Sequence, residues 1–288
     1  MTDAEKKQIT AKLMEIAKNE IRLTYAKPEE PLSPCSSRIG GCPAVPQDFV
    51  WPEYTGSGYY DEVKSRPLSF MAQINLKDVA EYDTEGILPK TGILSFFYEQ
   101  ISMSWGFDPK DKGSARVYYF PDETELTLRD IPESMDEECI IPELAVTFES
   151  HISLPEFSES PEICHDLDWD DYDECRQECG YEIDEWGDRT KLLCYPDTIQ
   201  NPMEEECETV TRGFRQGSPE DAEKVTAEEK EDIRCKAKEW IPLFQMGTIE
   251  TDDREFMFGD CGHLYFWIRK SDLQQYNFDN VWLILQCC

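Results

Sequence analysis

A short sequence occurs twice in this chain, and the repetition limits the folds open to it. PLSFMAQI at 67–74 returns as PLFQMGTI at 242–249, with proline, leucine, methionine and isoleucine at matching positions. Two further blocks recur in the same order: GILSFF (92–97) matches GHLYFW (262–267), and RIGGCPAVPQ (38–47) matches KLLCYPDTIQ (191–200). Chance matches would not keep one order, so the three blocks predict a strand unit that is duplicated within the chain.

A duplicated strand unit predicts two similar β-rich halves that bury their apolar faces against each other. We place these pseudo-repeat halves at about 36–120 and 189–288, with an acidic insertion at about 121–188, in a single domain spanning 1–288. Strands that recur with short turns between them favour hairpins over parallel crossovers. The predicted fold class is therefore α+β, built mostly from antiparallel β-sheets.

The alignment also makes predictions for individual side chains. Pro67 and Pro242 would begin equivalent strands, because the first residue of a strand needs no ladder N–H. Phe70 is matched with Gln245, which is the mismatched pair of the block. We expect Phe70 to face away from the shared core and Gln245 to be partly solvated, because side chains alternate along a strand.

Two segments have the pattern of helices. Residues 3–25 carry apolar side chains at helical spacing, and Thr2 with Glu5 can form a capping box. A long helix near 219–239 would begin after Ser218 at the N-cap, with Pro219 at its first position. Acidic residues fill its early turns and basic residues its last turns, as the helix dipole favours.

The net charge of the chain is strongly negative, and the excess is concentrated in its middle. Lys and Arg total 28 against 61 Asp and Glu, a net charge of −33. Residues 121–188 alone hold 24 acidic side chains and two basic ones, Arg129 and Arg176. Such a field repels nucleic acid and anionic membranes and attracts a basic protein. The alternative is a solvated acidic surface that only maintains solubility.

The lack of an export signal in the sequence and the spacing of its cysteines both favour the cytoplasm. The first twenty residues lack the apolar centre of a signal peptide, and no apolar run reaches the roughly 18 residues of a membrane span. We therefore expect a cytoplasmic protein. The twelve cysteines would then be reduced thiols without a native disulfide, and no cofactor is expected.

The repeated blocks and their neighbours resemble the YwqG-like family of bacterial proteins, a domain of unknown function. The resemblance rests on RIGGCPAVPQDFVWP, PLSFMAQINLKDV, LPKTGILSFFYE, KLLCYPDTIQNPM, FGDCGHLYFWIRKSDL and FDNVWLILQCC, which run from about Arg38 to the C-terminus. It implies an α+β fold rich in antiparallel strands in a cytosolic bacterial protein, and it implies no reaction. KLLCYP departs from the family pattern, which would favour glycine at Leu193 or Cys194 for a tight turn.

Metal binding is a possibility that the spacing of ligands leaves open. Cys164, His165, Cys175 and Cys179 could supply four ligands to zinc, although zinc modules more often use a C-x2-C spacing. The oxygen-rich DLDWDDYDE segment at 166–174 could hold calcium, but the EF-hand spacing is absent. We predict no metal site.

A thiol, a carboxylate and an imidazole occur close together in the GDCGH segment. Cys261 and His263, two residues apart in an extended stretch, would share a face and could act as nucleophile and base. Asp260 is explained equally well as a turn residue between two glycines. The structural interpretation is favoured, and no catalytic residue is predicted.

Glutamines recur in the repeated and family-matching blocks. Paired amides can bind a polar ligand, with a tryptophan as one wall of the site, and more often they satisfy backbone groups at strand ends. The predicted ligand-binding residues are Trp51, Gln73, Gln200, Asp260 and Gln286.

Two classes of function remain after these considerations. The first is an acidic protein-interaction module, immunity- or escort-like, that binds a basic partner protein and neither nucleic acid nor membrane. The alternative is a small-molecule-binding protein or enzyme that uses a polar cleft between the two repeats. The chain has no Walker loop, G-x-G-x-x-G, G-x-S-x-G or H-E-x-x-H sequence, which favours the non-enzymatic class.

Overall fold

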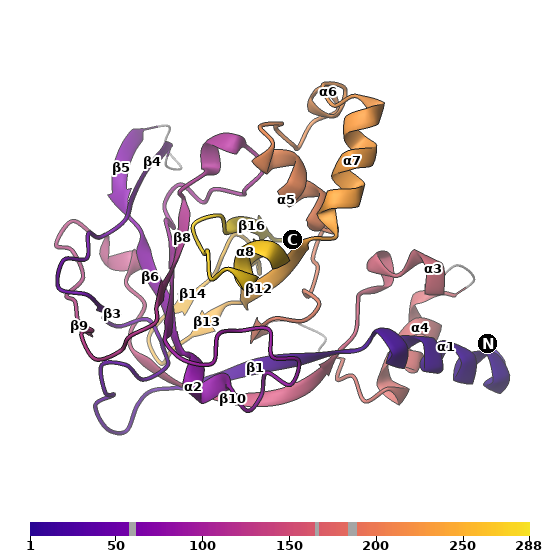
Figure 1. Cartoon of the computed structure of the whole chain (residues 1–288), viewed down its shortest axis with the longest axis horizontal. Helices are drawn as coiled ribbons and strands as arrows, with labels where there is room; N and C mark the ends of the chain where they lie inside the picture. Colours follow the sequence, from indigo (N-terminus) through magenta and orange to yellow (C-terminus); the bar gives the residue numbers. More distant parts are fainter. Residues whose placement is uncertain (58–61, 165–166, 184–188) are drawn as a thin grey trace.

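One large, strongly curved antiparallel sheet dominates the computed structural model, which describes residues 1–57, 62–164, 167–183 and 189–288 (Figure 1). Its ten described strands follow the order β16-β15-β12-β11-β1-β10-β2-β6-β7-β8. In chain order they are β1 (Lys18–Ala26), β2 (Arg38–Ile39), β6 (Ser69–Asn75), β7 (Ile93–Tyr98), β8 (Ala115–Phe120), β10 (Leu144–Ser153), β11 (Thr190–Leu192), β12 (Trp240–Met246), β15 (His263–Arg269) and β16 (Trp282–Gln286). The predicted α+β class is confirmed.

Smaller elements surround this sheet. The strand pairs are β3 (Ala44–Val45) with β9 (Thr127–Leu128), β4 (Glu53–Ser57) with β5 (Val63–Pro67), and β13 (Ile249–Glu250) with β14 (Glu255–Phe256). The helices are α1 (Asp3–Ile16), α2 (Leu76–Val79), α3 (Pro161–Cys164), α4 (Trp169–Glu178), α5 (Glu204–Thr211), α6 (Pro219–Ala222), α7 (Ala227–Ala237) and α8 (Lys270–Gln274), with 3-10 turns η1 (Pro109–Asp111), η2 (Glu137–Cys139) and η3 (Phe157–Glu159). None of the described helices is both long and apolar enough to cross a membrane.

The strand order has a two-fold symmetry. Strands β1, β2, β6, β7 and β8 form a first unit, and β10, β11, β12, β15 and β16 repeat it in the same chain order. The first strands are exchanged: β1 pairs with β11 of the second unit, and β10 pairs with β2 of the first. Between β1 and β10, Thr24 lies opposite Thr147, and their hydroxyls are 2.6 Å apart. The pseudo-two-fold axis passes through this pair.

The two units agree in backbone detail, at a register that differs from the sequence alignment. The β6–β7 ladder shifts between Phe70 and Ala72, and the β12–β15 ladder shifts between Pro242 and Phe244. Arg38 of β2 pairs with Gln73, and Lys191 of β11 pairs with Gln245.

The structural partner of Gln245 is therefore Gln73, three residues along from the Phe70 assigned by sequence. Both glutamines are buried, so the expectation of a partly solvated Gln245 was wrong. Gln73 Oε1 accepts a hydrogen bond from Ala44 N and Gln245 Oε1 accepts one from Asp197 N, each at 2.8 Å. Pro67 ends β5 and Pro242 lies inside β12, so the expectation that these prolines begin equivalent strands was also wrong.

A buried ion pair is duplicated together with the strands. Arg38 pairs with Glu143, which directly precedes β10, and Lys191 Nζ lies 3.3 Å from Oε2 of Glu20 in β1. Arg38, Lys191 and Glu20 are almost completely buried. Each unit thus supplies the acid that neutralises the base of the other, which couples the two units across the exchanged strands.

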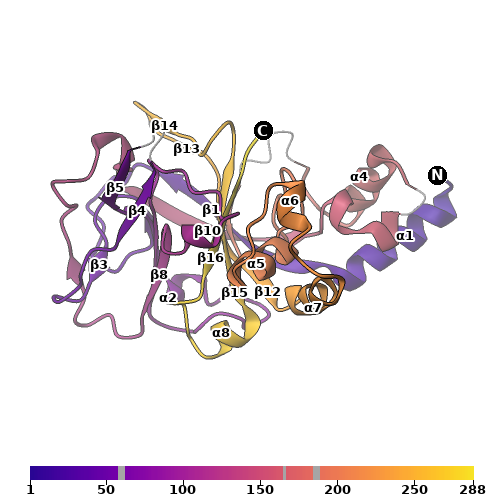
Figure 2. The same cartoon turned by 90° about the horizontal axis from the view of Figure 1, so that it is seen from above.

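The main core lies on the concave face of the sheet, between the two units. The rings of Phe96 in β7 and Phe244 in β12 have centroids 4.5 Å apart, and Phe266 of β15 lies 5.3 Å from Phe96. Side chains alternate along β15, so Tyr265 and Trp267 face the opposite side and pack with residues of α5. Figure 2 shows α5, α6 and α7 on that outer side.

Both predicted helices are present, but each differs in extent. The Thr2–Glu5 capping box forms as predicted, yet α1 ends at Ile16 and the chain continues as strand β1 from Lys18. The segment at 219–239 contains two helices, because a second capping box at Thr226 and Glu229 starts α7 after α6 has ended at Ala222. Within the acidic stretch, β10 joins the sheet while α3 and α4 pack on α1.

The turn that lacks the family's glycine is nevertheless tight. Leu193 and Cys194 have φ angles of 59° and 77°, in the left-handed region that glycine prefers. The equivalent residues of the first unit are Gly40 and Gly41, with φ angles of 60° and 70°. The second unit therefore keeps the same backbone at an energetic cost, because a left-handed non-glycine residue costs about 1–2 kcal/mol.

Candidate functional site

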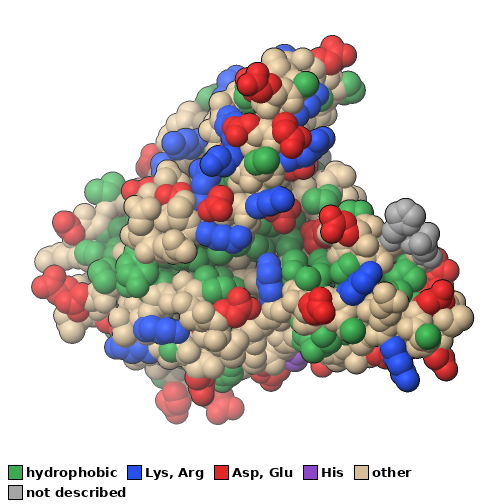
Figure 3. All heavy atoms as spheres, turned by 45° about the vertical axis from the view of Figure 1, so that its right-hand side comes forward, with side chains coloured by type: hydrophobic (Ala, Val, Ile, Leu, Met, Phe, Trp, Pro, Cys, Tyr) green, Lys and Arg blue, Asp and Glu red, His purple; other side chains and the backbone are tan. Residues whose placement is uncertain are grey.

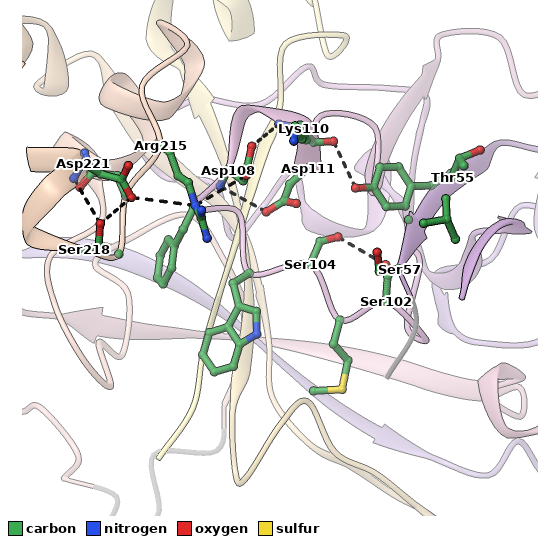
Figure 4. Close-up of a pocket in the computed structure, with 18 of the residues that line it drawn as sticks. Thr55, Ser57, Ser102, Ser104, Asp108, Lys110, Asp111, Arg215, Ser218 and Asp221 are labelled. Atoms are coloured by element: carbon green, nitrogen blue, oxygen red, sulfur yellow. Dashed lines mark hydrogen bonds and ion pairs between the residues drawn. The ribbon is translucent and has the colours of Figure 1, made fainter. Parts of the chain in front are cut away.

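A cleft of about 810 Å³ opens between parts of the two units (Figure 4). The β4–β5 hairpin and the 102–111 segment after β7 contribute from the first unit, and residues 215–221 contribute from the second. Loops form most of the wall, which is common for binding sites held on a rigid sheet.

The 102–111 segment is held rigidly against the edge strand β16. Leu285 N donates a hydrogen bond to Trp105 O at 3.1 Å, and the indole of Trp282 donates to Gly106 O at 2.9 Å. Gly106 has a φ of 81°, and a Cβ there would lie 1.9 Å from Leu283 O, so only glycine fits. This wall of the cleft is therefore preorganised.

An arginine lies between two carboxylates in the cleft, as Figure 4 shows. Arg215 Nε is 3.7 Å from Asp108 Oδ2 and 3.9 Å from Asp221 Oδ2. Ser218 Oγ donates to Asp221 Oδ2 at 2.8 Å, which orients that carboxylate. The Arg215 side chain is 65% exposed, so these long ion pairs stay accessible to solvent and are weak.

The remaining charges give the cleft an acidic excess. Four carboxylates line it, from Asp108, Asp111, Glu220 and Asp221, against the two cations of Lys110 and Arg215, and Lys224 Nζ lies 2.6 Å from Asp221 Oδ1 outside the lining. Burial raises the pKa of the Asp111 carboxyl, although hydrogen bonds from backbone N–H groups, that of Gly106 at 2.9 Å among them, oppose this shift. The electrostatics of the cleft therefore favour a cationic ligand.

Aromatic and apolar side chains complete the wall. Trp105 is 36% exposed, and Tyr54, Phe107 and Met103 also line the cleft. The Tyr54 hydroxyl donates to Lys110 O at 3.1 Å, which holds the hairpin against the η1 turn. Aromatic faces beside carboxylates suit a ligand that combines positive charge with an apolar body.

The residues predicted to bind a ligand lie elsewhere. Gln73 is fully buried, and its amide bonds only backbone groups of the 34–44 loop. The indole of Trp51 donates to Leu68 O at 2.8 Å and packs on Phe97. Gln73 therefore holds the 34–44 loop, and Trp51 holds the segment before β4 against the residue that precedes β6.

The structure brings two of the predicted residues, Gln200 and Gln286, together beside the edge strand β16. The side-chain oxygen of Gln286 accepts hydrogen bonds from Ile199 N and Gln200 N at 3.1 and 3.0 Å. The Gln200 amide donates to Cys287 O at 2.8 Å, while the exposed Asp260 accepts from Cys288 N through its backbone oxygen. These contacts join the chain end to the loop after β11.

A substitution tests this structural role of the glutamines. Gln286→Leu would leave two backbone donors and the Asn201 carbonyl without their buried partner. We expect the free energy of unfolding to fall by about 1–3 kcal/mol, measured by urea denaturation. Gln8→Leu on the exposed side of α1 is the control. A loss for Gln286→Leu that is no larger than the loss for Gln8→Leu would contradict the structural role.

The GDCGH segment forms a turn and the start of β15. Cys261 is exposed with a φ of 49°, and the buried His263 ring places Nδ1 3.1 Å from the Tyr265 hydroxyl. That hydroxyl donates to Asp197 O at 2.6 Å, so the imidazole belongs to the packing beneath the 197–201 loop.

The described candidates for zinc ligands, Cys164, Cys175 and Cys179, lie in α3, in α4 and at the end of α4. Of the proposed zinc ligands, His165 lies outside the described residues, as does Asp166 of the acidic segment. Among the residues that are described, no three His, Cys, Asp or Glu side chains form a group that could hold a metal ion. All twelve cysteines are free thiols.

Sequence reasoning missed the cleft because its residues follow no repeat. The signal available was the "SMSWGFDPKD" stretch at 102–111, which places a glycine, a tryptophan and two aspartates in a loop directly after a predicted strand. An aromatic residue among turn residues at such a place is a pattern typical of a binding loop.

Comparison with known families finds one match. A family model described as Domain of unknown function (DUF1963) covers residues 37–287. The match includes both units except for β1, which lies upstream of it although it pairs with β10 and β11. No curated protein matches the chain.

Proposed function

The chain belongs to the DUF1963 family, and because that membership assigns no activity, we propose its function from the cleft: the protein binds a basic segment of a partner protein, in the manner of an immunity or escort protein. The observation that carries this proposal is the pair Asp108 and Asp221, on opposite sides of the cleft, with the exposed guanidinium of Arg215 between them. A cation of the partner would displace Arg215 from this position.

The surroundings of the cleft support the same ligand. The partner's arginine or lysine would gain two carboxylates, while its apolar neighbours would pack on Trp105 and Phe107. The chain's net charge of −33 would speed the encounter with a basic partner at low ionic strength. The small-molecule alternative places its ligand between the two units, where this cleft lies. A single polar cation is therefore the second candidate ligand.

The test uses a fluorescein-labelled peptide that alternates arginine and leucine, with its glutamate–leucine counterpart as a control, in a polarisation titration. We expect only the basic peptide to bind. The double variant Asp108→Asn/Asp221→Asn should weaken binding at least tenfold. Asp252→Asn/Asp253→Asn, exposed in the segment between β13 and β14, removes the same charge elsewhere and should change the affinity less than threefold.

The outcomes separate local recognition from general attraction. Equal losses in the two double variants would show that only net charge matters, and absence of binding by the basic peptide at 50 mM salt would refute the proposal. Full competition by spermidine or arginine amide, at concentrations no higher than those of the peptide, would assign the cleft to a small cation instead.

A further inference from the structure

A second hollow lies between the start of β1, the loop at 85–87, β12 and α8. Its volume is about 410 Å³. Its apolar lining comes from Ile87, Leu193, Ile241, Pro242 and Leu273. Lys18, Lys270 and Glu85 supply charges at its edges. Figure 3, in which the α1 side of the molecule comes forward, shows a depression of this character, with hydrophobic side chains inside and charged ones around it.

The pseudo-two-fold axis relates this groove to a place in the first unit that the chain itself fills. By the registers of the paired strands, Ser69 is equivalent to Ile241, and Gln100 to Lys270. Ser69 Oγ lies 3.8 Å from Met135 Sδ, and Gln100 Nε2 donates to Cys139 O at 3.1 Å. The filling segment is 135–139, MDEEC, whose Met135 and Cys139 make these contacts while its three acidic side chains are exposed.

In the second unit, the segment that corresponds to 135–139 does not fill the groove. In the first unit the filler is the chain that leads into β10, and its counterpart is the chain that leads into β1. That chain is α1, whose Leu13 is buried in a separate cluster with Tyr172 and Cys175 of α4. Figures 1 and 2 both show α1 directed away from the sheet, beside α4.

The groove differs from its filled counterpart in charge. Lys270 stands where the first unit has Gln100, and Lys18 stands where, by the register of β1 with β10, it has the buried Ile141. The Lys18 ammonium lies 4.0 Å from the centroid of the Tyr195 ring. Burial and the nearby Lys270 lower the pKa of Lys18, while Glu85 and Glu204 oppose this shift. The Lys270 ammonium donates a hydrogen bond to Lys238 O at 2.8 Å and keeps further donors for an anion in the groove.

We propose that this groove binds a small apolar carboxylate, with its carboxylate between Lys18 and Lys270 and its hydrocarbon body on Ile241 and Leu273. The volume of about 410 Å³ suits a ligand of this size. In the equivalent place of the first unit, Ser69 and Gln100 contact the Met135 thioether and the Cys139 carbonyl, so this backbone arrangement accepts an apolar body and a polar oxygen. The site is separate from the Asp108–Asp221 cleft.

The experiment compares octanoate with 1-octanol and octylammonium, by calorimetry and by the NMR shifts of the Ile241 and Leu273 methyl groups. We expect octanoate to bind at least tenfold more tightly than either, and both methyl signals to shift. Lys18→Ile/Lys270→Gln grafts the residues of the first unit and should weaken octanoate binding at least tenfold. Lys7→Ile/Lys64→Gln makes the same charge change at exposed positions and should leave the affinity within twofold.

A further variant separates loss of the site from loss of the fold. Ile241→Trp fills the groove while keeping both lysines, and it should abolish octanoate binding while the protein still unfolds cooperatively in urea. The proposal is overturned if octylammonium or octanol binds as tightly as octanoate, if the grafted variant keeps its affinity, or if octanoate shifts neither methyl signal. Asp108→Asn/Asp221→Asn should not alter octanoate binding, so this test and the cleft test fail independently.

Discussion

Replacing Lys191 with methionine is expected to lower the free energy of unfolding by about 3–5 kcal/mol. Lys191 Nζ lies 2.9 Å from Asp197 Oδ2 and 3.3 Å from Glu20 Oε2, and its side chain is 1% exposed. Methionine keeps much of the volume and removes the charge. Glu20 would then keep only Arg22 as an ion-pair partner, and Asp197 only Arg189, among the described residues.

Urea denaturation of purified protein measures this loss. Lys7→Met, at an exposed position of α1, removes the same charge and should change stability by less than about 0.5 kcal/mol. Adding Glu20→Gln to Lys191→Met should restore part of the loss, because it removes a buried charge that Lys191 no longer helps to neutralise. A loss below about 1 kcal/mol for Lys191→Met would show that the duplicated ion pair contributes little to the coupling of the units.

The second large effect is expected for Glu159→Gln, and it depends on pH. Burial raises the pKa of Glu159 to about 7 from the ordinary value of 4.5, with Glu204 adding to the shift and a hydrogen bond from Thr198 opposing it. Between these two values the folded protein holds a proton that the unfolded chain has lost. The free energy of unfolding therefore falls as pH rises from 4.5 to 7.

The size of this effect follows from the shift. One pKa unit corresponds to about 1.4 kcal/mol, so ionised Glu159 costs up to about 3 kcal/mol at pH 8. Glu159→Gln should match the original protein near pH 4.5 and exceed its stability at pH 8, in urea titrations at both values. Glu162→Gln, exposed on α3, should give no such difference. An equal gain at both pH values would show that packing, and not ionisation, causes the change.

The sequence was informative about the units and less so about their boundaries. Repeated blocks identified the strands β6, β7, β12 and β15, because their buried side chains recur in both copies. A fourth block escaped notice: NEIRLT (19–24) returns as PELAVT (142–147), and it contains Glu20 and Glu143 of the duplicated ion pair. Residues 18–25 were predicted as helix, and they form β1 because β10 and β11 pair with them on both sides.

The site was less predictable than the fold. The glutamines of the repeats were chosen as ligand-binding residues, whereas Gln73 and Gln245 make the same backbone contacts in the two units. Such contacts are local to a repeated loop and therefore recur with it. The cleft is lined by loops that meet only after both units have assembled, so Asp108 and Arg215, far apart in the chain, carry no mutual pattern.

The amino-acid sequence by itself determined several strands of the sheet, the capping box that begins α1 and the acidic excess, since these depend on residue type and short-range spacing. Tertiary structure alone decided which unit each first strand joins. β1 and β10 present similar residues, and in the exchanged arrangement Glu20 meets Lys191 and Glu143 meets Arg38 across the sheet. It also decided that the place filled by 135–139 in one unit stays an open groove in the other, because α1 finds its buried contacts on α4.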